Sequence, residues 1–255
     1  WVNIDTIYST IELFSIEYEN SIIIVCFALP IIIKNKVTRK QLGTITGCIL
    51  GDGHIQKRDK NRVNSKINGR YIISIKASSK NYIVFLCEKV FIFSGKIILN
   101  PYPNIKLPQH ENKKVTQYFF YRRSIPFFTD LHNIWYKWNA SENKYIKIVP
   151  KNVSDIFTCE TIAHWIIQDG YFDNYGRRKT TILCTESFSK NECYILQQAL
   201  SSFNIKTRLK VRNKEKGRYR IRIRKKSISK VIELVKDIIP IEYHYKIGIK
   251  YLGLL

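Results

Sequence analysis

Apolar positions recur with helical or strand periodicity in two successive parts of the chain, and each part begins with an apolar helix that ends at Asp-Gly. In the first part the pattern predicts a helix from Thr38 toward Asp52, a strand at 71–77, a helix at 80–93, strands at 96–99 and 115–123, and a helix at 125–137. In the second part it predicts a helix at 157–168, a strand at 178–186, a helix at 190–203, strands at 206–212 and 218–224, and helices at 227–237 and 242–250. The shared order predicts an α+β fold built from two similar units, for which duplication is the economical explanation.

Segments of different composition bound these two units. We expect an N-terminal extension at 1–36, a first unit at 37–138, a Lys- and Asn-rich linker at 139–155 and a second unit at 156–255. The extension holds the one strongly apolar run, residues 21–33, which is too short for a spanning helix and is interrupted by Pro30. We therefore expect no membrane partner.

The two Asp-Gly helices have surfaces that favour close packing. Residues 47–53 read GCILGDG and residues 163–170 read AHWIIQDG. Gly47 and Gly51 leave one stripe of the first helix without side chains, and Ala163 is a small residue on the second. Two such helices can approach closely and bring their C-terminal ends together.

Each helix then presents one aspartate, Asp52 or Asp169, and the two lie 117 positions apart (169 − 52). A carboxylate at a helix C-terminus is unfavourable because the helix dipole is negative there, so two together require a cation between them. Clustered carboxylates suit Mg²⁺ that is held partly by substrate phosphates. A single Asp-Gly at a helix end is ordinary turn chemistry, but two at matching places predict a symmetric metal site.

The charge of the chain points to a polyanionic partner. There are 43 Lys and Arg against 20 Asp and Glu, a net charge of +23, which favours nucleic acid over an anionic membrane surface. In two adjacent strands of the second unit basic residues alternate with apolar ones, so each strand carries its cations on one face. Unless an anion lies across them, these cations would repel one another. The residues expected to contact nucleic acid are Lys57, Arg58, Lys76, Arg123, Lys179, Arg208, Lys210, Arg212, Arg218, Arg220, Arg222 and Arg224.

Cysteines and histidines add no further site. The 6 cysteines are scattered without a Cys-x-x-Cys pair, and several lie within apolar runs, so we interpret them as reduced, buried thiols of an intracellular protein. The 5 histidines have no metal-ligand spacing. The sequence therefore predicts neither a zinc site nor a disulfide framework.

On these residues the chain resembles the LAGLIDADG homing endonucleases, in the single-chain form with two motifs that mitochondrial group I introns encode. Residues 47–53 resemble the first family motif and residues 163–170 the second, and the resemblance runs from about residue 38 to about residue 250. It implies two pseudo-symmetric αββαββα units, with the motif helices at their interface and a saddle of antiparallel sheets over nucleic acid. It also implies hydrolysis of both strands of a DNA duplex across the minor groove.

The same resemblance implies the roles of individual residues. Asp52 and Asp169 are expected to be catalytic and to bind divalent metal, Mg²⁺, together with the residues before them, Gly51 and Gln168. Lys147, which precedes an apolar-Pro pair, and Lys246, near the C-terminus, match family lysines that organise water or stabilise charge. Gln168 departs from the family pattern, in which an acid often stands beside the aspartate.

Two functions of different class fit this sequence. The first is a monomeric, site-specific, Mg²⁺-dependent endonuclease that cuts double-stranded DNA. The second is binding of structured RNA, as an intron maturase or as a structural protein of an organellar ribonucleoprotein such as the mitochondrial ribosome. The paired aspartates favour the enzyme, since a pure RNA binder needs neither. Abundant Ile, Asn, Lys and Tyr indicate an AT-rich gene, so we expect the mitochondrion or another organelle.

Overall fold

A computed structural model describes residues 37–57, 68–91, 98–175 and 179–253. The predicted N-terminal extension and Arg58 lie outside the described residues. The first unit consists of α3 (Arg39–Leu50), β1 (His54–Gln56), β2 (Arg70–Lys76), α4 (Lys80–Phe85) with a π-helical turn at Leu86–Val90, β3 (Ile98–Tyr102), β4 (Gln117–Tyr121) and α5 (Pro126–Trp135). A hairpin of β5 (Tyr136–Asn139) and β6 (Lys144–Lys147) follows it.

The second unit repeats this succession of elements. It consists of α6 (Cys159–Asp169), β7 (Gly170–Asp173), β8 (Thr180–Cys184), α7 (Lys190–Ser201), β9 (Thr207–Asn213), β10 (Arg218–Ile223), α8 (Ile228–Val235), a 3₁₀ segment at Ile241–Ile247 and α9 (Ile249–Leu252). The two four-stranded sheets have the orders β1-β2-β4-β3 and β7-β8-β10-β9, and all their pairings are antiparallel. The equivalent strand order confirms the prediction of an α+β fold with two pseudo-symmetric units.

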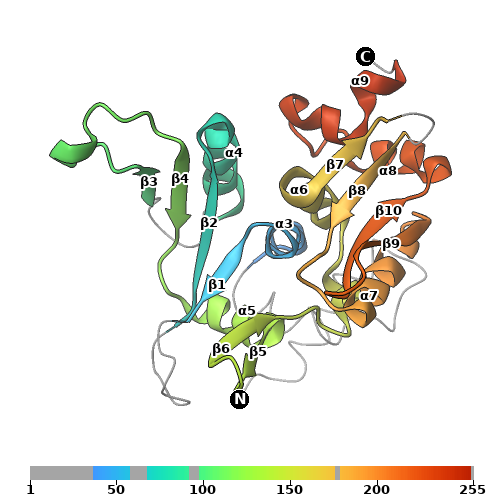
Figure 1. Cartoon of the computed structure of the whole chain (residues 1–255), viewed down its shortest axis with the longest axis horizontal. Coiled ribbons are helices and arrows are strands. Elements are labelled where there is room, and N and C mark those ends of the chain that lie inside the picture. Colours follow the sequence, from blue (N-terminus) through green and yellow to red (C-terminus); the bar gives the residue numbers. More distant parts are fainter. Residues whose placement is uncertain (1–36, 58–67, 92–97, 176–178, 254–255) are drawn as a thin grey trace, which may run out of the picture.

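The motif helices α3 and α6 pack against each other between the two sheets (Figure 1). Their first turns are fixed by capping boxes. In α3, Gln41 N–H donates to Thr38 Oγ1 at 3.1 Å and Thr38 N–H donates to Gln41 Oε1 at 2.9 Å. Thr158 and Thr161 form the corresponding box of α6.

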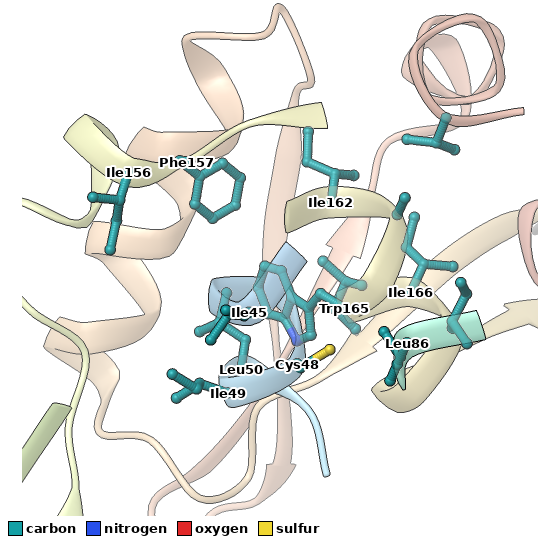
Figure 2. Close-up of a cluster of buried hydrophobic side chains, with 14 of the residues drawn as sticks. Ile45, Cys48, Ile49, Leu50, Leu86, Ile156, Phe157, Ile162, Trp165 and Ile166 are labelled. Atoms are coloured by element: carbon teal, nitrogen blue, oxygen red, sulfur yellow. The ribbon is translucent and has the colours of Figure 1, made fainter. Parts of the chain in front are cut away.

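Buried apolar side chains from both helices share one core. Figure 2 shows Ile45, Cys48 and Ile49 of α3 near Trp165 and Ile166 of α6, and all of them are buried. Removing this much apolar surface from water is the main source of stability for such an interface. The core therefore fixes the two halves relative to each other at the place where their aspartates emerge.

Glycines allow the two helix backbones to come close. A Cβ on Gly47 would lie 2.5 Å from the Thr161 carbonyl oxygen, and a Cβ on Gly51 would lie 2.5 Å from Gln168 Cβ. Such distances are shorter than real Cβ contacts, so only glycine fits without a shift. The predicted close approach is confirmed, although Ala163, the small residue predicted to help, is not among the atoms nearest to these glycines.

Several short elements were not predicted. β1 and β7 directly follow the Asp-Gly pairs and have 3 and 4 residues, which is too short for an alternating pattern to be recognised. The β5–β6 hairpin reaches into the predicted linker, where the Trp138 and Tyr145 rings pack edge to face. No helix of the described residues is long and apolar enough to cross a bilayer.

The described cysteines are free thiols, as predicted. Cys48, Cys87 and Cys193 are buried, whereas Cys159 and Cys184 are only partly buried, so the prediction of burial was wrong for these two. Cys159 lies at the N-terminus of α6, and Cys184 lies at the end of β8 on the sheet face that carries the arginines.

Candidate active site at the ends of the two motif helices

The C-terminal ends of α3 and α6 place two carboxylates near each other. Asp52 stands in the turn just beyond α3, and Asp169 is the last residue of α6. A cavity of about 470 Å³ opens at the Asp52 side and is lined by Lys76, Tyr82, Gln168 and Lys246, among others. This cavity lies between the first sheet and the 3₁₀ segment of the second unit.

Both carboxylates are destabilised in their charged form. Loss of water around Asp52 raises the pKa of its carboxyl above the ordinary value, although Lys246 and Lys147 act in the opposite direction. Burial raises the pKa of Asp169 to about 6, and the negative charge of Asp52 contributes to that rise. The carboxylates of Asp52 and Asp169 are thus close enough to repel each other, as the sequence predicted.

Lys147 binds the end of α3 and does not pair with either aspartate. Its Nζ donates to the carbonyl oxygens of Ile49 at 2.7 Å, Gly53 at 2.9 Å and Gly51 at 3.3 Å. A cation at these unpaired carbonyls stabilises the negative end of the helix dipole. Burial lowers the pKa of Lys147 to about 8, while the two aspartates act in the opposite direction.

Lys246 does the same for the other motif helix. Its Nζ donates to the Ile167 carbonyl oxygen at the end of α6. Burial lowers the pKa of this ammonium group, and both aspartates act in the opposite direction. Two lysines far apart in sequence therefore occupy corresponding positions, one at the end of each motif helix.

The donor atoms at this site fit a hard divalent cation. Within the described parts of the chain, neither Asp52 nor Asp169 forms an ion pair, and no cluster of three or more His, Cys, Asp and Glu side chains occurs. Such a cation would be held by the two carboxylates, by a backbone carbonyl such as that of Gly51, and by oxygens from outside the protein. The Gln168 carboxamide already donates to Tyr82 and accepts from Asp52, which leaves its backbone carbonyl for a metal.

The raised pKa of Asp169 gives a testable dependence of stability on pH. The folded metal-free chain binds this proton more tightly than the unfolded chain, so its stability is expected to fall as pH rises from 3.8 to about 6. We expect the free energy of unfolding of the wild type, relative to Asp169→Asn, to decrease across this window. Urea unfolding in EDTA at several pH values measures the difference. A difference independent of pH would contradict the environment described for Asp169.

The predicted cationic face of the second sheet contains two acids. Arg220 pairs with Glu186 and donates to the Tyr171 hydroxyl at 3.0 Å, and Arg222 donates to Asp173 at 2.9 Å. The predicted repulsion among these cations is therefore weaker than expected, because Glu186 and Asp173 neutralise two of them. The other predicted cations that remain exposed on or beside this sheet are Lys179, Arg208, Lys210, Arg212, Arg218 and Arg224.

The corresponding face of the first sheet is more aromatic and amide-rich. Ser74 and Lys76 of β2 lie opposite Phe119 and Gln117 of β4, and Arg70 stacks over Tyr121. Lys76 and Arg123 are exposed and Lys57 is partly exposed. On the other face Phe120 and Arg122 are buried, and Arg122 donates to the Phe91 carbonyl at 2.6 Å.

Three polar residues near the site were not predicted: Tyr82, Asp173 and Glu186. Tyr82 comes from α4 and reaches the site only through the packing of that helix against α6, so its role has no local sequence signal. Asp173 and Glu186 are acids beside strands that are otherwise basic. An acidic residue next to a basic strand was the sequence signal that could have predicted these ion pairs.

Residues 42–231 match the sequence profile of the LAGLIDADG DNA endonuclease family, which is more than half of the chain. The chain belongs to this family. It is 28% identical over 215 residues to the DNA endonuclease I-ChuI of Chlamydomonas applanata, covering 83% of this chain and 96% of that protein. It is also 28% identical over 209 residues to the cytochrome b mRNA maturase bI2 of Saccharomyces cerevisiae, covering 81% of this chain and 47% of the maturase.

Solved structures of LAGLIDADG proteins share the fold. The homing endonuclease I-WcaI bound to its DNA recognition sequence superposes with a TM-score of 0.64 at 24% identity, covering 83% of this chain and 87% of that chain. The structure of I-DmoI in complex with DNA and Mn superposes with a TM-score of 0.50 at 16% identity, covering 77% of this chain and 96% of that chain. The architecture of two units around paired motif helices is therefore that of the family.

Proposed function

We propose that this LAGLIDADG protein is a site-specific DNA endonuclease that acts as a monomer and hydrolyses one phosphodiester bond in each strand across the minor groove. The observation that carries this proposal is the pair of aspartates at the ends of α3 and α6. They lie near each other without an ion pair to any described residue, in a chain of net charge +23. A divalent metal is the expected cofactor, and I-DmoI has been solved with Mn. We further propose that the metal of this chain is Mg²⁺.

A bound divalent metal would supply an activated water and stabilise the leaving oxygen. Asp52 and Asp169 would hold it, together with the Gly51 and Gln168 backbone carbonyls. Lys147 and Lys246 neutralise the negative ends of α3 and α6, so the carboxylates can remain close while metal and phosphate approach. The shared core of the two helices fixes both aspartates in one rigid frame.

The two sheet faces are proposed to bind the two halves of the DNA target. In the second unit, Glu186 and Asp173 fix the guanidinium groups of Arg220 and Arg222, whose remaining N–H donors suit the acceptors of guanine in the major groove. In the first unit, Gln117 and Phe119 suit adenine and the thymine methyl group better. We therefore expect an asymmetric target in which the guanine contacts lie in the half bound by the second unit.

Base readout and backbone contact are expected to separate by mutation. Replacing Arg222 by glutamine is expected to relax preference at one base pair, at a cost of about 1–3 kcal/mol there. Replacing the exposed Lys210 by alanine is expected to weaken binding to all sequences alike and to reduce the salt dependence of log K by about 1. Binding-site selection and titration at several salt concentrations measure both effects. Unchanged base preference in Arg222→Gln would contradict a readout role.

Binding of structured RNA is the rival function, and similarity to the maturase bI2 is the observation that favours it. For either function we propose a location in a mitochondrion or another organelle. The chain is similar to maturase bI2, which is named for cytochrome b mRNA. The basic faces fit RNA phosphates as well as DNA phosphates. The paired aspartates remain the feature that RNA binding does not require.

The proposal is tested by incubating the purified chain with a plasmid library of AT-rich organellar DNA in Mg²⁺ or in Ca²⁺. Discrete double-strand cuts in Mg²⁺ would support the endonuclease. Tight, salt-dependent binding to structured RNA, with no metal-dependent cutting of any DNA, would favour the rival.

A further inference from the structure

The Asp52 amide is bound by the opposite motif helix. The amides on either side of it bind carbonyls of α3 itself: Gly51 N–H donates to the Gly47 carbonyl at 3.2 Å, and Gly53 N–H donates to the Cys48 carbonyl at 2.8 Å. Asp52 N–H instead donates to Gln168 Oε1 of α6 at 2.8 Å. The peptide that carries the first catalytic carboxylate is thus held across the interface between the two units.

The Gln168 carboxamide is itself oriented by a buried network. Its Nε2 donates to the Tyr82 hydroxyl at 3.2 Å, and that hydroxyl lies 2.7 Å from His164 Nδ1. Because burial lowers the pKa of His164 to about 3, the imidazole is neutral and its Nδ1 can accept a hydrogen bond from the Tyr82 hydroxyl. Tyr82 and His164 are buried and their rings stack. The Tyr82 hydroxyl therefore holds the Gln168 carboxamide in one orientation.

Among the described residues of the second unit, this contact has no counterpart. The residue that precedes Asp52 is Gly51, and a Cβ at that position would already lie 2.5 Å from Gln168 Cβ. No side chain from α3 can therefore reach back toward Asp169 from the matching position. Asp169 is the last residue of α6, so its N–H belongs to that helix. The two pseudo-symmetric carboxylates are held by different means.

We propose that Gln168, oriented by Tyr82, is a positioning residue for Asp52, and that cutting of one DNA strand depends on this contact more than cutting of the other. This inference rests on the proposed endonuclease function. A carboxylate that binds metal loses activity when the groups that orient it are removed, typically by about 10- to 100-fold. In this proposal each carboxylate serves mainly one strand, so removing a contact to Asp52 alone slows one strand more than the other.

Two variants and one control test the contact. Gln168→Met keeps the length of the side chain and removes both hydrogen bonds, whereas Tyr82→Phe removes only the hydroxyl. Gln198→Met, on the exposed surface of α7, is the matched control. In the metal-free and DNA-free chain, we expect hydrogen exchange of the Asp52 amide to become at least about tenfold faster in both variants and to stay unchanged in the control. Unchanged exchange in both variants would overturn the proposal.

The second readout is the cutting of each end-labelled strand of a duplex that the wild type cuts. We expect both variants to slow the same strand at least about tenfold, with the other strand within about threefold, so that nicked DNA accumulates. Equal slowing of both strands would overturn the strand-specific role and leave the endonuclease proposal intact. If the wild type cut no DNA, the endonuclease proposal would fail, and the strand-specific role with it. If Gln168→Met did not fold, Tyr82→Phe would decide both readouts.

Discussion

Replacing Asp52 or Asp169 by asparagine is expected to abolish DNA cutting while duplex affinity stays within about threefold of the wild type. Asparagine has the shape of aspartate but lacks the negative charge that we propose to hold a divalent cation at the ends of α3 and α6. Metal contributes several kcal/mol of transition-state stabilisation, and each 1.4 kcal/mol is about a factor of ten, so we expect a loss of roughly a thousandfold or more. Affinity is expected to remain because the phosphate contacts are proposed to come from the sheets.

Cutting in Mg²⁺ and binding in Ca²⁺, each measured on the same duplex, separate the two effects. Asp237→Asn is the matched control, since Asp237 is an exposed aspartate just beyond the C-terminal end of α8 and takes no part in the site. We expect this control to cut and bind as the wild type does. Cutting at near wild-type rate by either active-site variant would contradict the assignment of that aspartate.

A valine at Gly47 is expected to destabilise the chain by about 3 kcal/mol or more and to abolish cutting. A Cβ at this position would lie 2.5 Å from the Thr161 carbonyl oxygen and 3.0 Å from His164 Cβ, and backbone cannot move aside cheaply. The two helices must separate, which removes apolar contacts from the shared core and moves Asp52 away from Asp169.

Urea unfolding followed by circular dichroism measures this loss. Gly217→Ala is the control, because a Cβ there meets nothing within 4 Å and the cost comes only from its φ of +56°. That cost is expected to be about 1 kcal/mol. A Gly47→Val variant no less stable than the control would contradict the close packing of α3 and α6.

The repeated pattern of elements could be predicted because it rests on local signals. The capping box of Thr38 and Gln41, the apolar spacing of the motif helices and the alternation along β9 and β10 each follow from nearby residues. The short strands β1 and β7 depend instead on pairing with β2 and β8, which no local pattern reveals. The domain boundaries at 37–138, 139–155 and 156–255 stay predictions.

The candidate site was predictable in its charged residues but not in its contacts. The two aspartates and two lysines could be proposed from motif and resemblance, and the structure brings them to the same pair of helix ends. That the lysines bind backbone carbonyls depends on folding of distant segments, as does the Gln168–Tyr82 contact. The acids beside Arg220 and Arg222 changed the expected chemistry of the second sheet.

Mapping of both cut ends at single-nucleotide resolution, on a target recovered from the plasmid library, tests the proposed function most directly. Two carboxylates held together at one pair of helix ends can serve only phosphates that lie close in space. We therefore expect one cut in each strand, the two facing each other across a single minor groove and both lost in EDTA. Cuts scattered along the duplex, confined to one strand, or separated by a full helical turn would contradict this account of the paired motif helices.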